Sequence, residues 1–283
     1  MSEKKTSSKC ETCQVAGCGA RTNTPPQKKV PQLSTRINKI IGVLSGKGGV
    51  GKSFVSSVLA VELARKGYRV GIMDADITGP SIPRIFSIHG YAYGDEKGMY
   101  PVRSEKYGIK VMSVNLLLDE EETPVLWRGP IVSGVVDQFY TDTYWEELDY
   151  LIIDMPPGTG DVALSVMQDI PLDGLVIVSN PSKLVSMIVA KAINMAKKTD
   201  TKIVGVVENM SYVACPNCGE KIELYPHNNT QELADKYEVP VLARMPLDPA
   251  LSALVEEGRI EDYDASYMEE VIKRITISDV TTC

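Results

Sequence analysis

Short apolar segments recur along the chain from about residue 38 onward, and helix-like segments separate them. The apolar segments have strand length and are rich in Val and Ile: Lys39–Ser45, Arg69–Asp74, Ile109–Asn115, Tyr150–Asp154, Gly174–Ser179, Lys202–Glu208 and Val239–Met245. Strands that are apolar at every position are typical of a parallel sheet covered on both faces by helices. The helix-like segments are Lys52–Lys66, Pro130–Trp145, Ser182–Lys198 and Thr230–Tyr237. This alternation predicts an α/β fold with a doubly wound, mostly parallel sheet and helices on both faces.

Two stretches depart from this pattern. Residues 1–36 contain Lys, Ser, Thr, Gln, Pro and three cysteines but almost no aliphatic periodicity, which predicts a flexible tail unable to build its own core. The folded domain is expected over residues 37–283. Within it, the polar stretch His89–Lys106 is predicted to be an irregular surface excursion.

Composition narrows the candidate partners. With 283 residues and 43% hydrophobic content, the chain can bury one large core, although its length also permits two domains. The net charge of −7 provides no global positive field for nucleic acid or an anionic membrane. The amino terminus is polar where a secretory peptide needs an apolar core, and no apolar run approaches the roughly 18 residues of a membrane span. We expect a soluble cytoplasmic protein.

The clearest chemical signal lies between the first apolar segment and the helix predicted after it. Its residues satisfy the P-loop pattern of nucleoside triphosphatases: Gly46, Lys47, Gly48, Gly49, Val50, Gly51, Lys52 and Ser53. The glycines let backbone N–H groups point at phosphates, and the following helix adds the positive end of its dipole. We expect Lys52 to bind the β and γ phosphates of ATP and Ser53 to bind Mg²⁺. The alternative is a glycine-rich turn that binds nothing, which the complete pattern in its strand–loop–helix context disfavours.

Two further apolar segments end in carboxylates. Asp154 is expected to hold Mg²⁺ through water at the carboxyl edge of the sheet. Pro157 and Gly158 follow in a glycine-rich loop, which is typical of a second switch that shifts when the γ-phosphate leaves. Asp74 and Asp76 end the second apolar segment. Asp74 is either catalytic or structural, capping a turn or bonding the P-loop.

The general P-loop pattern does not require Lys47. At this position the chain resembles the deviant Walker A loop of the MinD, ParA and nitrogenase-reductase superfamily. The resemblance implies that Lys47 reaches across a nucleotide-sandwich dimer to the partner's phosphates, where it would stabilise transition-state charge as an arginine finger does. It further implies that Asp76 lies at the magnesium site and orients the attacking water. A solvated lysine on the loop rim is the alternative.

The cysteines fall into two close groups and one terminal residue, which suits metal ligation better than a disulfide framework. Cys215 and Cys218 have the spacing of a tight turn that directs two thiolates at one metal, within a predicted metal-binding loop at residues 211–220. The spacing alone leaves an iron-sulfur cluster, zinc and a redox dithiol open. The tail cysteines are a candidate accessory metal site or uncoordinated: Cys10, Cys13 and Cys18.

In combination, the motifs resemble the Mrp/ApbC-type iron-sulfur carrier ATPases over about residues 37–260. They are Gly46–Ser53, Asp74–Ile77 with Gly79–Ser81, Trp127–Pro130, Asp154–Asp161, Val207–Met210 and Cys215–Cys218. The resemblance implies an ATP-binding homodimer with slow ATP hydrolysis, in which Cys215 and Cys218 of both subunits hold a [4Fe-4S] cluster across the two-fold axis. It also implies adenine recognition by Asn209 and delivery of the cluster to apo iron-sulfur client proteins, with cluster-assembly factors as further candidate partners.

Two other classes share these features. A ParA- or MinD-like positioning ATPase with a structural zinc site would bind DNA or a membrane, but Ala265–Cys283 has only two basic residues and does not resemble a basic membrane anchor. An electron donor resembling nitrogenase reductase would carry widely separated ligand cysteines. The adjacent pair therefore favours the carrier, and we expect neither a nucleic-acid nor a membrane partner.

Overall fold

The computed structural model describes residues 28–32, 34–118, 127, 129–225 and 229–276. Its nine-stranded sheet has the order β10-β9-β8-β1-β7-β2-β6-β5, with β11 pairing β9. The strands of this sheet are β1 (Arg36–Ser45), β2 (Val70–Asp74), β5 (Val102–Arg103), β6 (Lys110–Met112), β7 (Glu147–Asp154), β8 (Gly174–Ser179), β9 (Ile203–Ala214), β10 (Lys221–Glu223) and β11 (Val241–Pro246). The helices are α1 (Lys52–Arg65), α2 (Ile82–Ile85), α3 (Gly129–Thr141), α4 (Asp161–Asp169), α5 (Lys183–Lys198), α6 (Asn229–Tyr237), α7 (Pro249–Glu256) and α8 (Glu269–Thr276).

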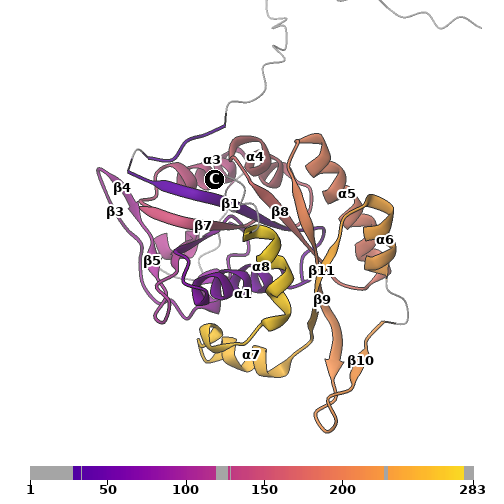
Figure 1. The fold of residues 1–283 in the computed structure, drawn as a ribbon. Helices are drawn as coiled ribbons and strands as arrows, with labels where there is room; N and C mark the ends of the chain where they lie inside the picture. The colour runs from indigo at the N-terminus through magenta and orange to yellow at the C-terminus, as the bar shows by residue number, and fades with distance from the viewer. Residues whose placement is uncertain (1–27, 33, 119–126, 128, 226–228, 277–283) are drawn as a thin grey trace, which may run out of the picture.

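The sheet is mostly parallel and doubly wound. Strand β1 lies between β8 and β7, and both pairings are parallel. From β1 the chain first builds β2 and β6 on one side and later β8, β9 and β11 on the other. Only the short strands β5 and β10 pair antiparallel in this sheet. Figure 1 shows α1 and α8 on one face and α3, α4 and α5 on the other, so the predicted fold class is confirmed.

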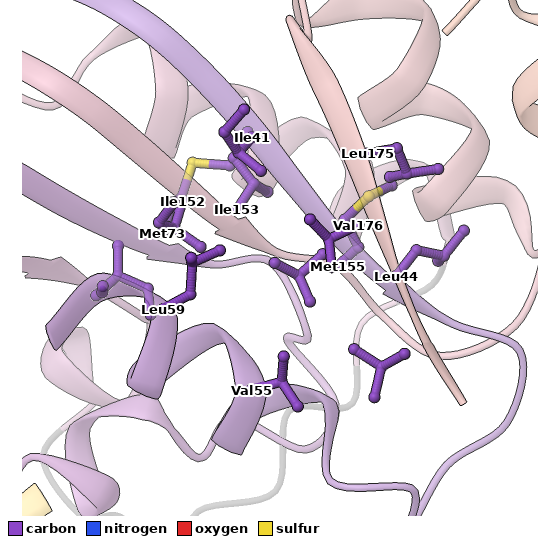
Figure 2. Packing of buried hydrophobic residues seen from close by; sticks show 14 of the residues in the cluster. Ile41, Leu44, Val55, Leu59, Met73, Ile152, Ile153, Met155, Leu175 and Val176 are labelled. Carbon is purple, nitrogen blue, oxygen red and sulfur yellow. The ribbon is translucent and has the colours of Figure 1, made fainter. Parts of the chain in front are cut away.

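The core joins this sheet to its helices. Val55 and Leu59 of α1 have no exposed surface, and Figure 2 shows them projecting toward the strands. Full burial of such a side chain stabilises the fold by about 1.5–3 kcal/mol. Strand β1 is buried from Ile40 to Ser45, directly before the P-loop. The loop is thus held between a buried strand and a packed helix.

The prediction of an irregular excursion at residues 89–106 is wrong. Strands β3 (Tyr93–Asp95) and β4 (Gly98–Tyr100) form a hairpin there, followed by β5. The Tyr93 and Tyr100 rings stack across the hairpin with centroids 5.9 Å apart. Gly98 turns the chain at a φ of 138°, and a Cβ there would lie 2.2 Å from the Asp142 carbonyl oxygen. Cross-strand aromatic contact and a glycine turn therefore order a segment whose polar composition predicted none.

Several predicted boundaries shift. Helix α3 ends at Thr141 rather than Trp145, because Thr143 pairs with Met99 of the hairpin. The strand predicted over Ile109–Asn115 is only β6, and a 3-10 helix follows at Val114–Leu117. Strand β9 instead runs to Ala214, past the predicted end at Glu208. Helices α4, α7 and α8 were not among the predicted segments.

The described end of the amino-terminal segment contacts the domain. The Lys28 ammonium group donates to the Met167 and Ile170 carbonyl oxygens at 2.6 and 3.0 Å. The Lys29 backbone N–H donates to the Asp169 carbonyl oxygen at 2.7 Å. These bonds tie the residues before β1 to the end of α4. No helix among the described residues has the length and apolar character required to cross a membrane.

Candidate functional site

The P-loop connects β1 to α1 at the carboxyl edge of the parallel sheet. Gly51 precedes α1 with a φ of 79°, and a Cβ there would lie 2.2 Å from the Asn209 side-chain nitrogen, so this position requires glycine. A cavity of about 330 Å³ opens beside the loop and is lined by the following residues: Ser45, Gly48, Gly49, Gly51, Lys52, Ser53, Phe54, Asp76, Gly79, Ser81, Ile85 and Pro157. The loop, the segment that follows β2, the predicted second switch and the start of α1 thus surround one space.

Asp154, at the end of β7, is fully buried and joins three side chains of α1. Its Oδ2 accepts from the Lys52 ammonium at 2.7 Å and from the Ser53 hydroxyl at 2.6 Å. Its Oδ1 accepts from the Ser56 hydroxyl at 2.6 Å. A buried carboxylate needs such donors, because its desolvation is otherwise unfavourable by several kcal/mol. The arrangement brings together the lysine, hydroxyl and carboxylate predicted from the sequence.

Ser56 is a site residue that sequence reasoning missed. It is buried in the second turn of α1. Its hydroxyl lies 3.1 Å from the Lys52 carbonyl oxygen and 2.6 Å from Oδ1 of Asp154. A serine inside a helix usually bonds the preceding turn, so its position gives no signal of a second role. Only the register of α1 against β7 reveals it.

The two aspartates after β2 have different environments. Asp74 is 1% exposed and accepts from the backbone N–H groups of Asp76, Ser81 and Ile82 and from the Ser113 hydroxyl, at 3.1–3.3 Å. Burial, and next the nearby Asp154 charge, raise the pKa of Asp74 to about 7. These bonds support the structural interpretation of Asp74, because they fix the segment from Asp76 to Ile82 to the end of β2.

Asp76 faces the nucleotide cavity instead. Its Oδ2 lies 3.8 Å from the Lys52 ammonium, and its Oδ1 accepts from the Thr78 hydroxyl at 3.3 Å. Burial raises the pKa of Asp76, while the Lys52 charge acts against that shift. A carboxylate beside the phosphate-binding lysine is well placed to contact a metal ion or a water molecule.

Lys47 is exposed at the rim of the P-loop. The Ser45 hydroxyl donates to its carbonyl oxygen at 3.0 Å, which fixes the backbone. In the described part of the chain its ammonium group has no ion-pair partner, whereas Lys52 has two. The two lysines of the loop therefore differ in direction, one inward and one toward solvent.

Asn209 connects the P-loop to β9. Its side-chain nitrogen donates to the Val50 carbonyl oxygen at 2.9 Å, and its side-chain oxygen accepts from the Met210 N–H at 2.9 Å. Met210 has a φ of 55°, a left-handed conformation that is unfavourable for a residue with a side chain. The same strand that reaches the P-loop continues to the cysteine pair.

The cysteine pair lies at the tip of a two-stranded ribbon. We call residues 212–224 the cysteine ribbon: the end of β9, a turn, β10 and Leu224. Residues 211–214 belong to β9, so the predicted loop is shorter than residues 211–220. The turn is closed by the Cys215 N–H donating to the Glu220 carbonyl oxygen and the Gly219 N–H to the Cys215 carbonyl oxygen, both at 2.8 Å. Figure 1 shows the ribbon projecting from the body of the domain.

The turn favours the thiolate form of Cys215. Hydrogen bonds from the backbone N–H groups of Asn217 and Cys218, and then from the Cys218 thiol, lower the pKa of Cys215. Cys215 is partly exposed and Cys218 exposed, and both are free thiols. A thiolate is the form that binds metals, so this turn suits a metal ligand.

The described residues contain no group of three or more His, Cys, Asp or Glu side chains that could hold a metal ion by itself. The pair on the ribbon therefore supplies two sulfur ligands of any site built there. Cys10, Cys13 and Cys18 of the candidate accessory site lie outside the described residues.

Comparison with known proteins matches residues 36–278 to the family model described as NUBPL iron-transfer P-loop NTPase, within the ParA group. An iron-sulfur cluster carrier protein of Clostridium perfringens is 46% identical over 265 residues, covering 91% of this chain and 92% of the relative. A protein of Kluyveromyces lactis named cytosolic Fe-S cluster assembly factor CFD1 is 42% identical over 235 residues, covering 81% and 83%.

Among solved structures, a nucleotide-binding protein from Archaeoglobus fulgidus in complex with ADP is 45% identical to this chain. The two align with a TM-score of 0.74 over 82% of this chain and 91% of that one. The family match over residues 36–278 and the identities of these relatives confirm the resemblance to the iron-sulfur carrier ATPases.

Proposed function

The chain belongs to the NUBPL iron-transfer P-loop NTPase family, and we propose that it is an ATP-dependent scaffold and carrier of an iron-sulfur cluster. The observation that carries the proposal is the pair Cys215 and Cys218, displayed at the tip of a ribbon whose strand also contacts the P-loop. The names of the Clostridium and Kluyveromyces relatives support the same role.

ATP binding would rest on the P-loop and on Lys52. The Lys52 ammonium already faces two carboxylates inside the cavity, so binding of the β and γ phosphates would exchange its pairing with Asp154 for a phosphate. The Ser53 hydroxyl oxygen and Oδ2 of Asp154 lie 2.6 Å apart. Both suit Mg²⁺, which prefers oxygen ligands. Bound magnesium would neutralise charge on the phosphates; Ser53, Asp76 and Asp154 would hold it.

Hydrolysis would use residues at the edge of the same cavity. We assign Asp76 to orientation of the attacking water, because its carboxylate faces the cavity beside Lys52. Lys47 points to solvent and would complete the site of a second subunit, where its cation would stabilise transition-state charge. An active site that needs a partner's lysine would hydrolyse ATP slowly in isolated chains. Pro157 and Gly158 would respond to loss of the γ-phosphate, since Pro157 lines the cavity.

The cargo would be a [4Fe-4S] cluster shared by two copies of the chain. Cys215 and Cys218 supply two thiolates, and a two-fold dimer supplies the four that a cubane cluster requires. Because Asn209 belongs to the strand that leads to the cysteines and its side chain donates to the Val50 carbonyl oxygen of the P-loop, the nucleotide state can influence the geometry of the cluster site. Apo iron-sulfur proteins of the cytoplasm would receive the cluster, and cluster-assembly factors would supply it.

Anaerobic reconstitution tests the proposal. Wild-type protein and Cys215→Ser and Cys218→Ser variants are loaded with iron and sulfide, and iron, labile sulfide and zinc are then counted per chain. We expect Mössbauer parameters of a [4Fe-4S] cluster in the wild type, loss of that signal in both variants, and unchanged ATP binding by calorimetry. If Cys215 and Cys218 bind zinc and no labile sulfide is found, the protein has a structural zinc site and the carrier proposal is wrong.

A further inference from the structure

Another cavity lies where the cysteine ribbon leaves the sheet, and it shares no lining residue with the nucleotide cavity. Its volume is about 120 Å³. One water molecule needs about 10–15 Å³ of such space, so the cavity can also hold the end of a side chain. The lining residues come from β9, the ribbon, β11 and the segment after β8: Pro181, Glu208, Ser211, Tyr212, Lys221, Glu223, Tyr225 and Arg244.

Glu208 supplies the buried charge of this cavity. It pairs with Arg244 across β9 and β11, and its side chain is 2% exposed. Its Oε1 accepts from the Ser211 hydroxyl and lies 3.7 Å from Nε of Arg244. Its Oε2 is buried and has no hydrogen-bond partner among the residues that the structure describes. A buried carboxylate oxygen without a donor is unfavourable, so a group that donates to Oε2 would be stabilised in the cavity.

The other charged side chains of the lining lie nearer to solvent. Arg244 is 42% exposed, and Lys221 and Glu223 are exposed as well. Water and salt screen the charges of exposed groups, whereas a buried charge acts through a medium of low dielectric constant. The electrostatic potential inside the cavity is therefore dominated by Glu208, and it favours a cation.

The aromatic lining suits the rest of a long basic side chain. Tyr212 and Tyr225 are both partly exposed. The hydrocarbon stem of a lysine or arginine can pack on such rings while its charged end reaches a carboxylate. The Lys221 ammonium already lies 4.6 Å from the centroid of the Tyr212 ring, which shows that this ring accepts a cation.

We propose that this cavity binds a lysine or arginine side chain of another protein, which donates to Oε2 of Glu208 and packs against Tyr212 and Tyr225. A bare metal ion fits less well, because the described residues contain no group of three or more side chains that could ligate one. The cavity lies at the base of the ribbon that carries Cys215 and Cys218. A protein bound there would be held beside the cysteine turn, and its identification as a client that receives the cluster rests on the proposed function.

The test is a peptide titration of the full-length, cluster-free protein with Mg²⁺ and ATP, followed by TROSY NMR of the backbone amides. The probe is acetyl-glycyl-arginyl-glycine amide. The same peptide with citrulline keeps the shape of the side chain but has no charge, so this comparison needs no protein variant. Glu208→Gln removes the buried charge, and Glu223→Gln removes an exposed charge of the same cavity as the matched control. Calorimetry of ATP binding checks that both variants are folded.

We expect the arginine peptide to cause saturable shifts in the amide signals of residues 208–212 and 221–225. The citrulline peptide, and the arginine peptide with Glu208→Gln, should have dissociation constants at least about tenfold higher, since each combination lacks a hydrogen bond between two charged groups. Glu223→Gln should bind the arginine peptide within about threefold of the wild type, because an exposed ion pair contributes little.

Equal affinity for the arginine and citrulline peptides would overturn the proposal, as would equal affinity of the wild type and Glu208→Gln. Absence of saturable shifts would mean that the cavity holds only water. Methylguanidinium that binds as tightly as the peptide would mean that the cavity takes small free cations rather than a protein side chain.

Failure of the carrier function gives a different result, since the titration uses no cluster: the peptide binds to Glu208, but the reconstituted protein contains no labile sulfide. Cluster transfer identifies the partner. In transfer to an apo [4Fe-4S] client enzyme, Glu208→Gln should raise the KM for the client and leave the cluster content of the carrier unchanged. An unchanged KM would show that the partner is not this client.

Discussion

Replacement of Ser56 with Ala should separate the positioning of Asp154 from the general stability of α1. The hydroxyl of Ser56 donates at 2.6 Å to Oδ1 of Asp154, whereas Lys52 and Ser53 bond Oδ2. Without Ser56, the buried Oδ1 loses its donor. An unsatisfied buried acceptor is unfavourable by about 1–3 kcal/mol, so the free energy of unfolding should fall by about that amount.

Ser57→Ala is the matched control. Ser57 is buried on the same helix, but its hydroxyl donates to the Ser53 carbonyl oxygen at 2.8 Å and does not bond Asp154. This local bond adds little stability to a helix, so the control should unfold within about 0.5 kcal/mol of the wild type. Urea denaturation of magnesium-free protein measures both variants.

A second measurement distinguishes positioning from stability. Because Ser56 orients the carboxylate expected at the magnesium site, Ser56→Ala should raise the Mg²⁺ concentration for half-maximal ATP hydrolysis about fivefold or more, the lower end of what 1–3 kcal/mol implies. Ser57→Ala should leave it unchanged. Equal unfolding free energies and equal Mg²⁺ dependence in the two variants would refute this account of Asp154.

Three further perturbations test other parts of the site. Lys52→Ala should abolish tight ATP binding in calorimetry, and unchanged affinity would contradict the site assignment. Lys47→Ala should retain ATP binding but suppress ATP hydrolysis. Equal loss of binding and hydrolysis would show that Lys47 binds the nucleotide of its own subunit. The pKa of Asp74 is raised from 3.8 to about 7, so from about pH 4 to 7 the folded state holds a proton that the unfolded chain has lost. In magnesium-free buffer the free energy of unfolding should therefore fall as pH rises through this interval, by at most about 1.4 kcal/mol per unit, and level off above it. Asp74→Asn should flatten this slope, and an unaltered slope would assign it to another group.

The sequence predicted the sheet and the phosphate site because both depend on local patterns. A continuous apolar run followed by the P-loop glycines predicts a buried strand, a turn and a helix, and Gly51 is the local signal of the turn, because its φ of 79° is a conformation that glycine adopts readily. The β3–β4 hairpin also depends on the Asp142 carbonyl beside Gly98, a contact that is distant in sequence, and the stacking of Tyr93 on Tyr100 forms only once that turn is in place.

The cysteine ribbon was only partly predictable. The Cys-x-x-Cys spacing identified the turn, but not that β9 continues from Glu208 through the left-handed Met210 to form one side of a ribbon. The alternation of polar and apolar residues from Lys221 to Leu224 is a period-two signal for its return strand. It is four residues long, too short to stand out against the surrounding polar sequence.

In the proposed function, Cys215 and Cys218 hold a cluster that the protein delivers to other proteins. The most direct measurement is activation of a purified apo [4Fe-4S] enzyme by the reconstituted protein, in a full-length background where Cys10, Cys13 and Cys18 are replaced by Ser. We predict that this protein holds about four irons per dimer and restores the enzyme's activity, as a cubane shared by four thiolates requires. Addition of Cys215→Ser should remove both the iron and the activation while ATP binding persists. Full cluster content and full transfer in the Cys215→Ser protein would contradict the account.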